Sequence, residues 1–155
     1  MEIIYEKLNE DIKDPEQAHH NDSGYDLFYP GETIFLQRGE RITVNLGIKF
    51  DIDMNGISYA MKRDFCIGVE LQIRPKSGLS KKGIDVELGT IDEGYRGFVG
   101  CTITNNSNHD TKIEQHQKIC QIVCVPVFNR IVMVKGKVDE NTARSTNGFG
   151  STGIN

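Results

Sequence analysis

Apolar and polar residues alternate along residues 41–50. Apolar side chains stand at every second position, while polar residues and one glycine fill the positions between them: Ile42, Val44, Leu46, Ile48 and Phe50. A period of two is typical of a β-strand with one buried face. The pattern therefore predicts a strand over residues 41–50.

Further strands are predicted downstream. Val69, Leu71 and Ile73 repeat the alternation. Residues 119–127 form a nearly continuous apolar run rich in Val and Ile, which indicates a strand buried on both faces. Ile131–Val134 is a shorter candidate strand, and the best helical candidate is a short turn at Ser77–Lys82.

The spacing of these segments indicates the fold class and the domain limits. Short strands separated by Gly, Asn and Asp clusters favour an antiparallel sandwich or barrel. Residues 51–68 contain Asn55-Gly56, a tight-turn dipeptide, and are interpreted as a hairpin-like insertion. Residues 144–155 hold little that can pack, so we expect them to order only on a ligand or a partner subunit. One domain over residues 1–143 and a flexible tail over residues 144–155 follow.

Composition narrows the function classes. A chain of 155 residues is long enough for one domain with a core, and its net charge of -4 does not favour nucleic acid as a partner. We see no signal peptide and no apolar run near the roughly 20 residues that span a membrane. The four cysteines lack zinc-site spacing, so reduced thiols are expected. An intracellular protein, cytoplasmic or nuclear and without a membrane partner, is predicted.

Five short segments carry residues suited to chemistry. They are Ser23-Gly-Tyr-Asp-Leu27, Arg74-Pro-Lys-Ser-Gly-Leu79, Gly89-Thr-Ile-Asp-Glu-Gly-Tyr-Arg-Gly97, Gln117-Lys-Ile-Cys-Gln-Ile-Val123 and Arg144-Ser-Thr-Asn-Gly-Phe-Gly-Ser-Thr-Gly153. Each one alone is explained by a turn, a sheet surface or a loose terminus. The second offers a cation, a hydroxyl and backbone amides together, which suits a phosphate. The fifth adds Arg, Ser and Thr for phosphate oxygens and Phe149 for stacking on a base. The phosphate-binding loop of P-loop NTPases has no match.

In this order, the five segments resemble the trimeric deoxyuridine triphosphatase family over about residues 23–153. The resemblance implies an all-β, distorted jelly-roll or β-barrel-like sandwich that forms a homotrimer with C-terminal arm exchange. It also implies Mg²⁺-assisted hydrolysis of dUTP to dUMP and pyrophosphate. That reaction limits uracil incorporation into DNA and supplies dUMP for dTMP synthesis.

The resemblance assigns roles to the third segment. Asp92 would be the general base for the water that attacks the α-phosphorus, and the Tyr95 ring would pack under the deoxyribose and exclude a 2′-hydroxyl. The uracil edge would pair with hairpin backbone groups at Gly89, Thr90, Ile91 and Gly100.

The other segments would bind the phosphates. Lys76, Ser77, Gly78 and Gln121 match phosphate contacts, with Lys76 where family members often carry Arg, and Asp26 matches a site-organising carboxylate. The tail would be a lid over a neighbouring subunit's site, contributing Arg144, Phe149, Gly150, Ser151 and Thr152. It departs from the family at residues 144–147, where glycines are usual. Mg²⁺ would be held by the phosphates and water, with no protein ligand.

Three alternatives explain parts of the pattern. A dCTP deaminase shares the fold and a similar Ile-Asp-x-Gly motif, but it needs a catalytic Glu at the position of Thr102. A non-catalytic binding protein on this fold would leave Asp92, Tyr95 and the complete tail without a role. A capsid-type jelly roll would explain the strands and leave the five segments unexplained.

Overall fold

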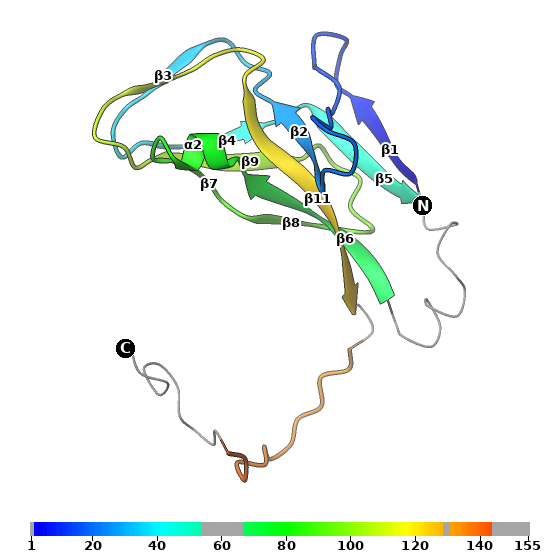
Figure 1. Cartoon of the computed structure of the whole chain (residues 1–155). Coiled ribbons are helices and arrows are strands. Elements are labelled where there is room, and N and C mark those ends of the chain that lie inside the picture. The colour runs from blue at the N-terminus through cyan, green and yellow to red at the C-terminus, as the bar shows by residue number, and fades with distance from the viewer. Residues whose placement is uncertain (1, 54–66, 129–130, 144–155) are drawn as a thin grey trace.

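The computed structural model describes residues 2–53, 67–128 and 131–143, which form eleven strands and one short helix. The helix, α2, spans Ser77–Ser80 (Figure 1). The strands in chain order are β1 (Glu2–Lys7), β2 (Gly24–Phe28), β3 (Ile34–Leu36), β4 (Arg41–Asn45), β5 (Ile48–Asp53), β6 (Ile67–Pro75), β7 (Ile84–Val86), β8 (Gly89–Asp92), β9 (Gly100–Asn105), β10 (Thr111–Ile113) and β11 (Lys118–Phe128).

The strands form four small antiparallel sheets. The largest has the order β2-β11-β6-β8, a second has the order β4-β9-β7, and the pairs β1-β5 and β10-β3 complete the set. Their inward side chains meet in one core, whose fully buried members include Leu27, Ile73, Ile103, Ile113 and Ile119. The expected all-β sandwich is confirmed, as is the helical turn that begins at Ser77.

The alternating segment at residues 41–50 is two strands rather than the one predicted. Val44, Leu46, Ile48 and Phe50 are buried as the alternation requires, but the chain turns between β4 and β5. Gly47 has a φ of 69°, a left-handed conformation that favours glycine. Because β4 pairs with β9 and β5 pairs with β1, burial continues through the corner while the partner strand changes.

Strand β11 is central, and it is buried less evenly than predicted. It pairs with β2 on one side and with β6 on the other. Ile119, Cys120 and Ile122 are buried, whereas every residue from Val123 to Phe128 is half-buried or exposed. The prediction of burial on both faces therefore holds only for the first half of the strand in a single chain.

The strand predicted at Ile131–Val134 is wrong for the single chain. These four residues form no strand, and their exposed fractions lie between 69% and 91%. Figure 1 shows residues 131–143 extending away from the sheets, where no described strand lies beside them to accept backbone hydrogen bonds. An apolar β-prone sequence forms a strand only where a partner edge is available.

The predicted insertion lies mostly outside the described residues. Residues 51–53 end β5 and residues 67–68 begin β6, and these two strands belong to different sheets. Residues 54–66, with Asn55-Gly56 and Cys66, are not described, so the hairpin stays a prediction.

Cys101 and Cys120 are buried free thiols. A hydrogen bond between them, together with burial, raises the pKa of Cys120 above its usual value. No helix in the described ranges is long and apolar enough to cross a membrane.

Asn105, the last residue of β9, has a fully buried polar side chain that joins the end of β3 to the loop between β9 and β10. Its Nδ2 donates to the carbonyls of Leu36 (2.8 Å) and His109 (2.9 Å), and its Oδ1 accepts from the Ser107 amide (3.0 Å) and hydroxyl (2.7 Å). One buried residue thus makes four hydrogen bonds, as buried polar groups require.

We expect Asn105→Leu to lower the free energy of unfolding by about 2–4 kcal/mol, because it strands several buried polar groups. Urea denaturation at a fixed chain concentration measures this loss. Asn106→Leu is the matched control, since the Asn106 side chain binds only the exposed Asp85 carboxylate in the described structure (2.7 Å). Equal stability of the two variants would contradict the role given to Asn105.

Candidate active site

The turn that connects β8 to β9 forms the first part of the candidate site. It closes where the Tyr95 amide donates to the Asp92 carbonyl (2.9 Å), and Asp92 itself is exposed. A cavity of about 210 Å³ lies along β8 and this turn. It is lined by six of the residues expected to bind or act on substrate, together with three apolar neighbours: Gly89, Thr90, Ile91, Asp92, Tyr95, Gly100, Ile73, Phe98 and Val99.

The Tyr95 ring is folded back over the turn. Its hydroxyl donates to the Phe98 carbonyl (3.2 Å), and the ring passes over Gly97. A Cβ at position 97 would overlap Tyr95 Oη and Cζ. Gly97 is therefore the residue that gives this ring its room.

Arg96 fixes the same turn from outside. Its Nη1 donates to the carbonyls of Glu93 (2.7 Å) and Tyr95 (3.0 Å), and its Nη2 forms an ion pair with Asp51 of β5 (2.6 Å). Sequence reasoning assigned no role to this arginine. Its position after Tyr95 in the motif is the only signal that could have indicated one.

A buried carboxylate forms the centre of the second part of the site. The Asp26 side chain is only 8% exposed, and each of its oxygens faces a different lysine. Lys76 contacts Oδ1, and Lys118 lies 3.1 Å from Oδ2 and 3.1 Å from Glu16. The pKa of Lys118 is raised above its usual value, mainly by the hydrogen bond to Asp26 and to a smaller extent by the hydrogen bond to Glu16. The role of Lys118 was missed from sequence, although it lies within the fourth segment.

Gln121 and the turn after β6 complete this group. Gln121 lies opposite Asp26 on β2 and opposite Arg74 on β6, and its Nε2 donates to the Pro75 carbonyl (3.1 Å). Ser77 and Gly78 are exposed, and a Cβ on Gly78 would meet nothing within 4 Å. Backbone and hydroxyl donors are therefore open to an anion here.

Within one chain the two groups come near each other only at one end. Asp92 lies opposite Glu70 on β6, four residues from Arg74, which lies opposite Gln121. A strand rises about 3.3 Å per residue, so Asp92 and Gln121 are separated by about 13 Å along the sheet. Gly89 lies opposite Ile73, the residue next to Arg74. The expected lid residues Arg144, Phe149, Gly150, Ser151 and Thr152 lie outside the described residues.

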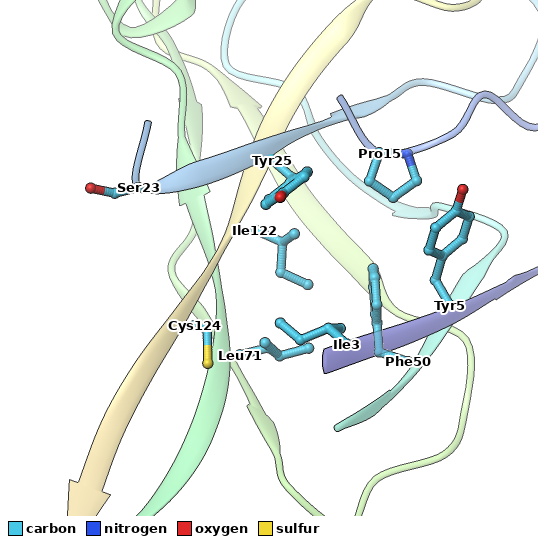
Figure 2. Close-up of a pocket in the computed structure, with 9 residues that line it drawn as sticks. All are labelled: Ile3, Tyr5, Pro15, Ser23, Tyr25, Phe50, Leu71, Ile122 and Cys124. Carbon is cyan, nitrogen blue, oxygen red and sulfur yellow. The ribbon is translucent and has the colours of Figure 1, made fainter. Parts of the chain in front are cut away.

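A second cavity, of about 360 Å³, lies away from both groups. Figure 2 shows Ile3 of β1, Phe50 of β5 and Ile122 of β11 directed toward the same space, with Tyr25 and Leu71 beside them. Its lining is mainly apolar, and none of the residues expected from sequence to bind substrate takes part in it.

Comparison with known proteins assigns this arrangement to a family. A model of the dUTPase family matches residues 10–153. The chain belongs to the dUTPase family. Its dUTPase relatives include the deoxyuridine 5′-triphosphate nucleotidohydrolases of Clostridium novyi (strain NT) and Hydrogenobaculum sp. (strain Y04AAS1). The first is 40% identical over 99% of this chain and 100% of its own, and the second is 37% identical over 99% of each. The family expected from the five segments is confirmed.

Solved dUTPases share the fold. A mutant dUTPase of Staphylococcus bacteriophage 80alpha, solved with dUpNHpp, superposes with a TM-score of 0.80 at 23% identity and covers 99% of both chains. A mutant dUTPase from phage phi11 of S. aureus, described with a structural Mg(II) ion, gives a TM-score of 0.72 at 22% identity. That match covers 90% of this chain and 99% of the phage protein.

Proposed function

We propose that the chain is a dUTP diphosphatase that hydrolyses dUTP to dUMP and pyrophosphate. The observation that carries this proposal is the cavity along β8 and the β8–β9 turn, which is lined by Asp92, Tyr95 and the backbone of Gly89 and Gly100. Relatives that match nearly the whole chain are named for this reaction. The reaction limits uracil incorporation into DNA and supplies dUMP for dTMP synthesis.

Asp92 acts as the general base. Its carboxylate is exposed at the cavity and can accept a proton from a water within hydrogen-bond reach. That water attacks the α-phosphorus, and pyrophosphate leaves. Backbone groups at Gly89, Thr90, Ile91 and Gly100 face uracil at the same cavity.

Tyr95 acts as the sugar filter. Its ring packs under the deoxyribose and leaves no room for a 2′-hydroxyl. The hydrogen bond to the Phe98 carbonyl and the clearance over Gly97 support this role, because both hold the ring in one place. The position at which a dCTP deaminase needs a carboxylate is Thr102, whose hydroxyl pairs with that of Thr43 (3.0 Å).

The phosphates bind at the second group. Lys76, Ser77 and Gly78 supply a cation, a hydroxyl and open backbone amides, and Gln121 lies on the adjacent strand. Asp26 organises this group through its buried carboxylate. The tail closes the site as a lid, with Arg144, Ser151 and Thr152 on the γ-phosphate and Phe149-Gly150 over uracil.

The residues at this group fit a Mg²⁺ ion held by the nucleotide. Asp26 directs both oxygens at lysines, so phosphate oxygens and water remain as the hard ligands that Mg²⁺ prefers. When bound, the ion neutralises phosphate charge. The role of this chain's residues is to hold the phosphates and to orient the attacking water.

The complete site forms in a homotrimer with exchanged C-terminal arms. Support comes from two apolar surfaces of the single chain. One is the exposed stretch Ile131–Val134, and the other is the mainly apolar cavity beside β1, which Figure 2 shows. Association of chains covers such surfaces. The enzyme acts inside the cell, where reducing conditions keep buried thiols such as Cys101 and Cys120 free.

Asp92→Asn should lower the turnover of dUTP by at least about 100-fold, because it removes the general base. Affinity for dUpNHpp should stay near that of the unmodified chain. Pyrophosphate release and calorimetric titration measure the two effects. Asp85→Asn makes the same chemical change at an exposed carboxylate that does not line the cavity, and it should retain full turnover. Near-normal turnover by Asp92→Asn would refute the mechanism.

Gly97→Ala should lower the preference for dUTP over UTP by about ten-fold, since its methyl group displaces the Tyr95 ring. The ratio of kcat/KM for the two nucleotides measures this preference. Gly94→Ala in the same turn is the control, because a Cβ there meets nothing within 4 Å. If both variants discriminate as well as the unmodified chain, Tyr95 is not the sugar filter.

Light scattering should report about three times the 17.4 kDa chain mass, as a homotrimer requires. Val132→Asp should lower the measured mass toward that of a single chain, because burying the exposed apolar stretch between chains would then bury a charge. Thr142→Asp provides a control in the polar part of the arm. A single-chain mass for the unmodified protein would rule out the shared site.

A further inference from the structure

A β-bulge places Lys118 beside Asp26. Opposed residues of antiparallel strands point to the same face of a sheet, and successive residues alternate between faces. Strands β11 and β2 pair regularly as far as Cys120, and beyond it the register shifts so that Lys118 lies opposite Phe28 instead of Tyr29. A shift of one residue moves a side chain to the other face. Lys118 therefore joins the face that carries Phe28 and Asp26.

Contacts confirm where this shift directs the lysine. Its ammonium lies 3.1 Å from Asp26 Oδ2 and 5.7 Å from the centre of the Phe28 ring. The Glu16 carboxylate, also 3.1 Å away, holds it from the other side. Lys118 is thus held by three groups, whereas the described contacts of the Lys76 ammonium are with Asp26 alone.

The two lysines on the Asp26 carboxylate differ in their other partners. Lys118 also pairs with Glu16, so these four side chains balance in charge, and Asp26 is the one described partner of Lys76. A buried carboxylate that loses its only counter-charge is strongly destabilised. If Asp26 had Lys76 as its only partner, this lysine could reach a phosphate only by leaving the carboxylate uncompensated.

We propose that Lys118 is a positioning residue of the phosphate site, which stays on Asp26 when Lys76 turns from this carboxylate to the phosphates of the substrate. The inference rests on the proposed function, in which Lys76 contacts phosphate. The flexible four-carbon stem of Lys76, whose side chain is 28% exposed, permits the movement. Lys118 acts through Lys76 and does not itself touch the substrate.

The test is a double-mutant cycle on the full chain, with inorganic triphosphate as the probe and calorimetric titration as the readout. Lys118→Gln should weaken triphosphate binding by about ten-fold when Lys76 is present, because Asp26 then retains Lys76. In the Lys76→Gln background, the same change should weaken binding by less than about two-fold. Lys118→Arg should restore binding by returning the counter-charge.

Controls separate this role from simpler ones. Lys112→Gln removes a lysine paired with Glu114 (2.6 Å) on β10 and should leave binding unchanged. Lys118→Met keeps an apolar stem over Phe28 without the charge, and should match Lys118→Gln if packing is not the cause. Thermal melting confirms that each variant is folded.

Equal weakening in both backgrounds would overturn the proposal, because it would mean that Lys118 only adds positive potential. The absence of weakening in the unmodified background, or of triphosphate binding to the unmodified chain, would overturn it as well. Failure of the proposed function is seen separately, as a failure of the unmodified chain to release pyrophosphate from dUTP.

Discussion

The antiparallel pairing of β11 with both β2 and β6 is the constraint on which the group of side chains around Asp26 depends. This pairing brings Asp26 from the N-terminal quarter of the chain opposite Gln121, and it aligns Gln121 with Arg74. Lys76 follows β6 directly, so its ammonium can reach the Asp26 carboxylate. Three segments far apart in the sequence meet because the central strand β11 pairs along both of its edges.

The β8–β9 turn is constrained differently, by contacts with its own backbone and with β5. Tyr95 and Arg96 both bond to carbonyls of the turn, and Arg96 also reaches Asp51. These contacts hold the turn against its own backbone and against β5. The two groups are thus each organised by contacts within the chain.

Much of the fold could be predicted from residue patterns. Alternation gave the buried positions around Val44 and Ile48 because burial and side-chain period are coupled locally. It did not give the corner at Gly47, since the change of partner strand there is a long-range event. The prediction of a strand at Ile131–Val134 was wrong for the same reason. A strand needs a partner edge, and the local pattern of residues does not show whether one is available.

The candidate site was predictable where motifs carry it and not where register does. Asp92, Tyr95, Gly89 and Gly100 lie around one cavity, as the resemblance indicated. Lys118 escaped notice because its importance comes from a one-residue register shift, which leaves no trace in composition or periodicity. Whether Arg144 and Phe149 join the site stays a prediction, because they lie outside the described residues.

The exposed stretch Ile131–Val134 has a consequence for biosynthesis. A new chain carries an uncharged, β-prone segment that remains accessible until another surface covers it. Aggregation and any association that covers the stretch compete for the same residues, and their balance depends on how fast chains meet. Arg130 and Lys135 flank the stretch in the sequence, where charged gatekeepers slow the wrong pairing.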